Sequence, residues 1–158
     1  MPDMLVKLYE LPPVASLCEE LSNQGVDIRR ALPPEKHVVL DWVREAFSDN
    51  WASECDRSFA NEPVSCFIAT DNNRPVGFAC YDATCRDFFG PTGVAEGSRK
   101  RGIGRALLLT CLHAMREQGY GYAIIGGAGP VDFYARVVGA VPIEGSQPGI
   151  YRGILRRE

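Results

Sequence analysis

Two hydrophobic patterns run through the chain. Short apolar runs at residues 64–70 and 75–81 are bounded by proline, asparagine or aspartate, which is typical of β-strands, and residues 26–32 also read as a strand. Elsewhere, apolar residues recur at intervals of three and four, as they do on the buried face of an amphipathic helix. Strands that alternate with helices predict an α/β fold.

The first 25 residues predict a strand and a helix of their own. Leu5 to Leu8 form a short apolar strand, and after Pro12-Pro13 a helical pattern leads to Gly25, which ends it. We expect this N-terminal extension, residues 1–25, to add an edge to the sheet or to contact a second copy in a homodimer. The sequence does not decide between them. The apolar positions of the helix are Val14, Leu17, Cys18 and Leu21.

Two short helices and a hairpin follow the strand at 26–32. Pro33-Pro34 suits the first turn of a helix, because the N–H that proline lacks has no partner there. Ser48-Asp49 ends this helix and caps a second one. The turn-forming residues 71–74 then join two strands into an antiparallel hairpin. The apolar faces of the helices consist of Val39, Trp42, Val43, Ala46 and Phe47, and of Trp51, Cys55 and Phe59.

A strand, a long helix and another strand organise the second half of the chain. Glycine and proline inside the strand at 88–94 predict an irregularity in the sheet. The helix at 103–118 stops at Gly119, and the continuous apolar run 120–125 suits a strand covered on both faces. A helix between two such strands predicts a parallel crossover. A further helix begins after Pro130, and two last strands are expected at 140–143 and 150–155.

Composition narrows the class of protein. A length of 158 residues fits one domain, and no apolar run approaches the roughly 20 residues that span a bilayer. The chain begins M-P-D-M-L-V-K-L, without the basic start and long apolar stretch of a signal peptide. We therefore expect a soluble, cytoplasmic protein without a membrane partner. Its six cysteines have no C-x-x-C spacing and read as reduced small hydrophobes, so no metal site is expected.

A basic, glycine-containing loop precedes the long helix. The net charge of the whole chain is -3, yet four cations cluster here, which indicates a local anionic ligand. Unpaired N–H groups at a helix N-terminus bind anions, and Gly102 and Gly104 leave room for a pyrophosphate to approach them. Turn glycines beside a solvated basic face would give the same pattern, so the loop alone leaves both readings open. The four cations are Arg99, Lys100, Arg101 and Arg105.

Three other ligand classes fit the loop poorly. It has no Gly-Lys-Ser/Thr ending of a P-loop. Leu107 stands where a dinucleotide fingerprint has its third glycine. The cations lack interleaved aromatic residues and a long basic face, so no nucleic-acid partner is expected.

Two motifs resemble those of the GNAT superfamily of N-acyltransferases. Arg99-x-x-Gly102-x-Gly104, between a strand and a helix, resembles the family's acyl-CoA motif Gln/Arg-x-x-Gly-x-Gly/Ala. Residues 133–140 resemble its Phe-Tyr-x-x-x-Gly-Phe segment, lengthened by one residue before Gly139 and with Ala140 in place of the aromatic. The resemblance extends from about residue 64 to 155 and matches the first sixty residues only in pattern.

The resemblance implies a fold and a donor site. The chain would be a single N-acetyltransferase domain, residues 1–158, with a mixed, splayed six- or seven-stranded sheet flanked by helices. Backbone N–H groups near Val94 would face the thioester carbonyl of acetyl-CoA. The family's cofactor-binding Asn has no counterpart in the glycine-rich turn 126–129. The implied acetyl-CoA-binding residues are Val94, Ala95, Arg99, Lys100, Arg101, Gly102, Ile103, Gly104 and Arg105.

The implied reaction is direct attack of a small-molecule primary amine on the acetyl thioester. Tyr134, in the matching Phe-Tyr pair, would be the general acid, although a core aromatic would fit the same helical spacing. A catalytically silent acyl-CoA sensor or interaction module remains the alternative function. No residue stands out as general base. Four carboxylates could place negative potential near the splay and favour a cationic acceptor: Glu54, Asp82, Asp87 and Glu96.

Overall fold

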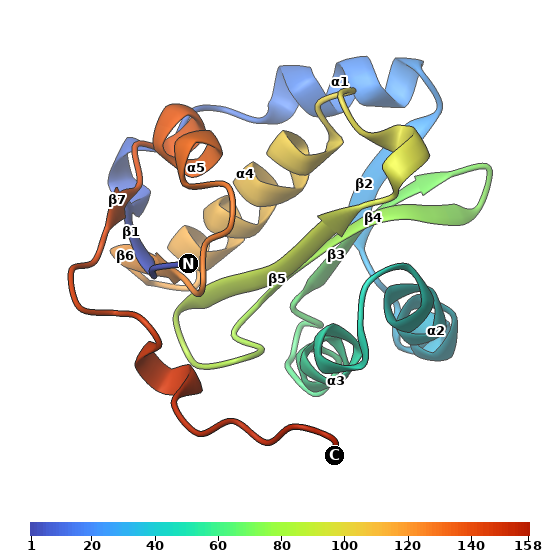
Figure 1. Cartoon of the computed structure of the whole chain (residues 1–158). Helices are drawn as coiled ribbons and strands as arrows, with labels where there is room; N and C mark the ends of the chain where they lie inside the picture. Colours follow the sequence, from blue (N-terminus) through green and yellow to red (C-terminus); the bar gives the residue numbers. More distant parts are fainter.

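A seven-stranded sheet organises the protein, whose computed structural model describes the whole chain, Met1–Glu158. The strand order is β2-β3-β4-β5-β6-β1-β7, and every neighbouring pair is antiparallel except β5 and β6 (Figure 1). This confirms the predicted α/β class and the mixed sheet. The strands are β1 (Met4–Lys7), β2 (Val26–Arg30), β3 (Cys66–Asp71), β4 (Arg74–Tyr81), β5 (Phe88–Val94), β6 (Tyr122–Ile125) and β7 (Val141–Pro142).

Five α-helices flank the sheet and divide its core in two. The larger hydrophobic cluster contains residues of α1, α4 and α5, and the smaller one contains residues of α2 and α3. In Figure 1, α2 and α3 lie together beside β3, β4 and β5, across the sheet from α4. The helices are α1 (Ala15–Asn23), α2 (Lys36–Ala46), α3 (Asp49–Ser58), α4 (Ile103–Glu117) and α5 (Val131–Val138). None is both long and apolar enough to cross a membrane.

Helix α4 confirms the predicted crossover, because it connects β5 to β6 and these two strands are parallel. Its buried face follows the helical spacing of apolar residues in the sequence, and Gly119, at φ +111, lies just after its end. The buried residues are Ile103, Ala106, Leu107, Leu108, Leu109, Cys111, Leu112, Ala114 and Met115.

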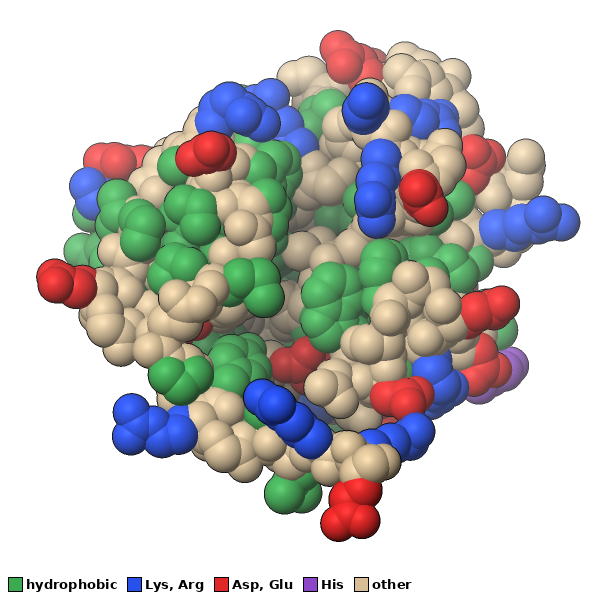
Figure 2. Space-filling view, in the orientation of Figure 1, with side chains coloured by type: hydrophobic (Ala, Val, Ile, Leu, Met, Phe, Trp, Pro, Cys, Tyr) green, Lys and Arg blue, Asp and Glu red, His purple; other side chains and the backbone are tan.

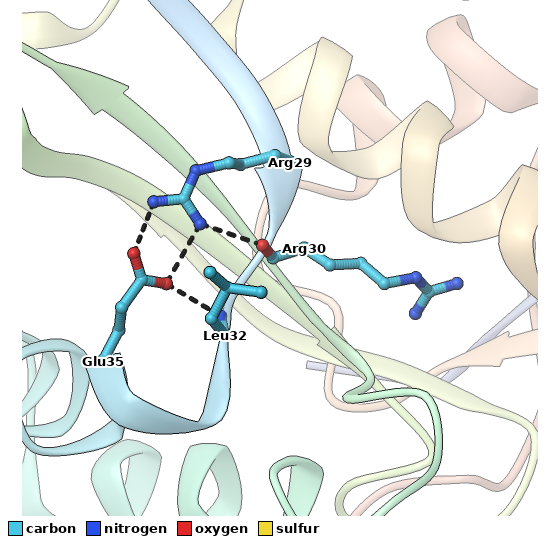
Figure 3. Close-up of polar contacts among 4 residues, drawn as sticks. All are labelled: Arg29, Arg30, Leu32 and Glu35. Atoms are coloured by element: carbon cyan, nitrogen blue, oxygen red, sulfur yellow. Dashed lines mark hydrogen bonds and ion pairs between the residues drawn. The ribbon is translucent and has the colours of Figure 1, made fainter.

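The connection from β2 to α2 is fixed by the Glu35 carboxylate. Arg29 donates to both of its oxygens, and the backbone N–H of Leu32 donates to Glu35 Oε2 at 2.7 Å (Figure 3). The Arg29 hydrogen bonds hold the pKa of Glu35 below its usual value. Arg30 points the other way, and its guanidinium stacks 4.6 Å from the centre of the Phe67 ring. The C-terminal end of β2 is thereby tied to the turn before α2 and to β3.

The N-terminal strand β1 is internal, so the expectation of an edge addition is wrong. It pairs with β6 from Met4↔Ile125 to Lys7↔Tyr122 and also contacts β7. Met4 and Val6 point into the larger core and are fully buried. A four-residue apolar strand does not itself reveal its partner, because long-range pairing depends on the rest of the sheet. Contact with a second copy stays a prediction.

The C-terminal segment also differs from expectation. The strand predicted at 140–143 shrinks to the two residues of β7, and that predicted at 150–155 does not form. A 3-10 helix, Gly149–Tyr151, takes its place, with Gly149 at φ +59 and Gly153 at φ +73. These positive φ angles turn the chain and interrupt the extended backbone expected at 150–155.

Strands β5 and β6 diverge after a short paired stretch. Only Phe88↔Ile124 and Phe89↔Ile125 are paired, while β5 continues to Val94. Opposite the same region, the register between β4 and β5 shifts between Ala79 and Tyr81. We call the end of the paired stretch, at Phe89 and Ile125, the fork. The sheet is therefore splayed as expected, and it opens toward the end of β5 that precedes α4.

Candidate active site

The N-terminus of α4 has unpaired backbone donors. Its first helical hydrogen bond runs from Ala106 N to Gly102 O, so the N–H groups of residues 103–105 have no acceptor within the helix. No side chain caps this end. Gly102 adopts φ +87, and Lys100 before it φ +67, so the loop turns sharply into the helix. The end of α4 therefore remains free to bind an anion.

The two positions of the motif differ in whether the fold itself requires glycine. A Cβ on Gly102 would lie 3.2 Å from Leu17 Cδ1 and would need the left-handed conformation, so the fold itself requires glycine there. A Cβ on Gly104 would meet only Val94 Cγ2, at 3.6 Å, which is an ordinary contact. The packing of the protein does not explain glycine at 104. A ligand that approaches the helix end closely does explain it.

The four cations of the loop are not equally free. Arg99 Nε donates to the carbonyl of Val94 at 3.2 Å, which fixes its side chain beside the end of β5. Arg101 Nη1 lies 3.7 Å from Asp71 Oδ2 on the β3–β4 turn. Lys100 and Arg105 are exposed and form no ion pair. The predicted basic loop thus surrounds the uncapped helix end.

The end of β5 directs backbone donors into the splay. Ala95 N donates to Val76 O at 2.8 Å, toward β4. Because the N–H groups of a strand alternate in direction, those of Val94 and Thr92 point away from β4, to the side where β6 has diverged. This geometry agrees with the expected orientation of the Val94 backbone.

Tyr134 of α5 is buried against the fork. Its ring meets Phe89 edge to face, with 6.4 Å between the ring centres, and only 5% of the residue is exposed. Burial raises the pKa of Tyr134 to about 12, so its hydroxyl stays protonated at neutral pH. The structure therefore brings the predicted catalytic tyrosine to the splay, although the same contacts would suit a core aromatic.

The glycine-rich turn 126–129, which lacks the family's Asn, is held by the N-terminal segment. Gly127 N donates to Asp3 Oδ1 at 2.8 Å, and Ala128 N donates to Pro2 O at 2.8 Å. The sequence predicted no partner for this turn. These contacts explain how a run of flexible residues is ordered beside the fork.

On the α3 side of the sheet, Glu54 accepts a hydrogen bond from Thr84 Oγ1 at 2.6 Å. Burial raises the pKa of Glu54, against the opposing effect of that hydrogen bond. Tyr151 lies next to this pair and also near Gly126, where its hydroxyl is 3.2 Å from the position of an added Cβ. Sequence reasoning missed Thr84, which lies in a turn without a periodic pattern, and Tyr151, which it placed in a strand that does not form.

Of the other carboxylates expected near the splay, Asp82 and Asp87 lie elsewhere. Asp82 accepts hydrogen bonds from Tyr120 Oη, at 3.1 Å, and from Gln118 Nε2, at 3.0 Å, beside the first residues of β6. Burial and the charge of Asp82 raise the pKa of the neighbouring Asp87 to about 6. Glu96 is exposed beyond the end of β5. For Asp82 and Asp87 the expectation was wrong, because the turn 82–87 folds them toward the C-terminal end of α4.

Three buried thiols have the spacing of metal ligands. The Sγ atoms of Cys55, Cys66 and Cys80 all lie within 4.8 Å of one another, inside the smaller core. Burial raises the pKa of Cys80 well above its usual value, whereas hydrogen bonds from Cys66 and Cys80 lower the pKa of Cys55 to about 5. The absence of a metal at these thiols stays a prediction.

The surface of the protein has a hollow that extends from the segment leading into α4. Figure 2 shows it between hydrophobic side chains near the centre of the view, with lysine and arginine side chains above it and an acidic side chain near its base. The basic edge lies over the segment that leads into α4 in Figure 1. Basic side chains also lie just below this acidic one, so cations are present at both ends of the hollow.

A forked sheet beside an uncapped, basic helix end is the arrangement that the resemblance to the GNAT superfamily implies. Residues 36–140, more than half of the chain, match the family model described as the acetyltransferase (GNAT) family. The chain belongs to this family. A search of curated proteins finds no match.

Solved structures share the fold at low sequence identity. A glucosamine N-acetyltransferase region of a fungal multi-domain β-N-acetylglucosaminidase is 15% identical, with a TM-score of 0.72 over 90% of this chain and 19% of that one. A GCN5-related N-acetyltransferase from Sphaerobacter thermophilus is 20% identical, with a TM-score of 0.69 over 90% of this chain and 48% of that one. This chain thus spans less than half the length of either protein.

A third similar structure was determined with a ligand. It is a GNAT family acetyltransferase from Brucella melitensis in complex with acetyl-CoA, 18% identical, with a TM-score of 0.56 over 70% of this chain and 80% of that one.

Proposed function

We propose that this protein transfers an acetyl group from acetyl-CoA to a primary amine of a small molecule by direct attack. The observation that carries the proposal is the opening of the β5–β6 splay next to the uncapped N-terminus of α4. One extended molecule can then have its phosphates at the helix end and its acyl group near the fork. The acetyl-CoA complex of the Brucella melitensis protein supports this donor.

The donor's pyrophosphate would accept hydrogen bonds from the N–H groups of residues 103–105. The free cations Lys100 and Arg105 add charge around it, while Gly104 keeps the approach open. The backbone of Val94 and Ala95, with Arg99 fixed to the Val94 carbonyl, would border the chain that leads to the thioester. Arg101 would contribute less, since Asp71 already faces it.

The acyl transfer step needs donors for the oxyanion that forms when the amine attacks. The N–H groups of Val94 and Thr92, which face the splay, suit this task because they are fixed by the β4–β5 pairing before reaction. A lysine-like amine with a pKa of about 10.4 is neutral in roughly one molecule per two thousand at pH 7. A proton acceptor near the fork must therefore relieve a handicap of about 4.6 kcal/mol.

Tyr134 would assist the departing thiolate. A pKa of about 12 exceeds the roughly 8.5 of a thiol, so complete proton transfer would be uphill by about 5 kcal/mol. The hydroxyl therefore acts as a hydrogen-bond donor to the developing negative charge on sulfur, and the final proton arrives from the amine through it or from water. This role requires the hydroxyl to remain protonated, which its burial ensures.

The test is a coenzyme A release assay with a panel of primary amines at saturating acetyl-CoA. We expect thiol release above the rate of hydrolysis for at least one amine, with the acetylated product identified by mass spectrometry. Tight acetyl-CoA binding without release for any amine would replace the transferase with a silent acyl-CoA sensor. Absence of acetyl-CoA binding would reject both functions.

A further inference from the structure

Three segments far apart in the sequence meet beside the fork. Glu54 comes from α3, Thr84 from the β4–β5 turn, and Tyr151 from the C-terminal 3-10 helix. Thr84 Oγ1 donates to Glu54 Oε1 at 2.6 Å. Tyr151 lies beside this pair, because the charge of Glu54 contributes to its raised pKa, after the larger effect of burial. We call these three residues the Glu54 group.

The Glu54 group lies where the two parallel strands separate. The Tyr151 hydroxyl is 3.2 Å, and the Phe88 ring 2.9 Å, from the place of a Cβ on Gly126. Gly126 directly follows Ile125, the last residue of β6 paired with β5. The cations around α4 lie at the other end of the splay. A donor anchored there would thus direct its acyl end toward the Glu54 group.

The carboxylate of Glu54 lacks a cation. None of the six ion pairs of the protein includes it, although it is partly buried. Burial and the Thr84 hydrogen bond are the causes of the shifted pKa of Glu54, and no cation is among them. A partly desolvated carboxylate with one hydroxyl donor retains capacity for a charged partner.

Two aromatic side chains, Trp51 and Phe47, lie on the same side of the sheet as this carboxylate. Trp51 precedes Glu54 by three positions in α3, so the two side chains emerge on neighbouring parts of one helix face. The Trp51 ring packs 5.2 Å from the Phe47 ring, centre to centre, and Phe47 in turn covers Gly93 of β5. A carboxylate beside aromatic faces is chemically suited to an ammonium group on an apolar body.

We propose that Glu54 binds the ammonium group of the acceptor and removes its proton, so that the acceptors are cationic primary amines without a nearby carboxylate. This rests on the proposed acetyl transfer. The N–H bond breaks as an O–H bond forms on Glu54, and the freed electron pair of nitrogen attacks the acetyl carbonyl. Collapse of the tetrahedral adduct breaks the C–S bond, the second amine proton passes to sulfur or water, and Glu54 returns its proton to solvent. Thr84 positions the carboxylate through its hydrogen bond.

The test compares Glu54→Gln with Asp56→Asn, a matched control on the same helix. Asp56 is exposed and paired with Lys36 at the surface, so its change removes a carboxylate outside the site. Both variants and the wild type are assayed with phenylethylamine, spermidine and glutamate as acceptors across pH 5 to 9. Acetyl-CoA affinity is measured by calorimetry, and the affinity of the coenzyme A complex for phenylethylamine is measured separately.

We expect Glu54→Gln to lower kcat/KM for the two cationic amines about a hundredfold or more, with unchanged acetyl-CoA affinity and weaker phenylethylamine binding. The wild-type kcat/KM should fall as the pH drops through the raised pKa of Glu54, and the variant should lose this dependence. Glu54→Asp, which keeps a carboxylate, should retain the pH dependence at a lower rate. Asp56→Asn should match the wild type.

Equal effects of the Glu54→Gln and Asp56→Asn changes, or a wild-type preference for glutamate, would overturn the role of Glu54. Unchanged phenylethylamine binding in Glu54→Gln would do the same even if the protein catalysed no transfer. Failure of the wild type to release coenzyme A with any amine, despite normal amine binding, would instead reject the proposed function. If Glu54→Gln does not fold, the pH dependence and acceptor affinity of Glu54→Asp decide the question.

Discussion

Gly104→Ala is expected to strengthen the free protein and weaken donor binding at the same time. The added methyl group meets only Val94 Cγ2, at 3.6 Å, so it fits without displacing a neighbour. Alanine in place of glycine stabilises a helix by up to about 1 kcal/mol. For a chain of this size that corresponds to an increase in Tm of about 2–4 °C or less.

Donor binding should change in the opposite direction. The methyl group stands beside the N–H groups of residues 103–105 and would push a pyrophosphate away from them. Loss of one charge-assisted hydrogen bond, about 1.5–3 kcal/mol, weakens acetyl-CoA binding about ten- to a hundredfold. Gly104→Glu adds charge repulsion to the collision and should weaken binding further. Calorimetric titration with acetyl-CoA measures both losses, and thermal unfolding measures stability.

Gly102→Ala is the matched control. Residue 102 has φ +87 and little space beside Leu17, so alanine there should lower stability by about 1–2 kcal/mol or more. The two alanine variants thus have opposite expected effects on Tm. If Gly104→Glu keeps the wild-type Tm and binds acetyl-CoA with wild-type affinity, the anion site is not at this helix end.

Two further predictions concern single polar groups. Tyr134→Phe should lower kcat about a hundredfold while acetyl-CoA affinity, measured by calorimetry, stays the same; a variant that keeps more than about half of wild-type kcat in rate-limiting chemistry would make Tyr134 a packing residue. Asp87→Asn should raise the unfolding free energy at pH 8, because the folded protein favours neutral Asp87, whose pKa is raised to about 6 from 3.8. That advantage should shrink as the pH falls through 6 toward 4, and urea denaturation that shows an equal gain at pH 8 and pH 4 would contradict it.

Local patterns along the chain were sufficient to predict most helices and strands and the basic loop of the candidate acetyl-CoA site. The Gly119 stop, the Ser48 cap and the continuous apolar run before Gly126 each have a short-range physical cause, and each lies where expected. Ser48 Oγ accepts from Trp51 N at 3.1 Å, which is the cap that the sequence indicated. The basic loop was equally visible, because the residues around the helix end are consecutive.

Local patterns could not predict which distant strands pair or which residues surround Glu54. Nothing in Met4–Lys7 specifies β6 as a partner, and the apolar residues after Gly149 do not reveal that the chain turns there. Thr84 becomes a candidate site residue only through its hydrogen bond to Glu54, and Tyr151 only through its position next to Gly126. Such contacts depend on how distant segments turn, and turns in irregular loops leave no periodic signal.

The internal position of β1 affects the order in which the protein is built. Its partner β6 is synthesised more than a hundred residues later, which at cellular rates means a delay on the order of ten seconds. The local hairpin of β3 and β4 and its extension by β5 can form during that time, since these segments are near neighbours in the chain. Met4 and Val6 meanwhile remain without their strand partners. The strands β3, β4 and β5 can therefore pair before β6, the second strand of the fork, has been synthesised. Strand β1 then pairs with β6 late and completes the sheet.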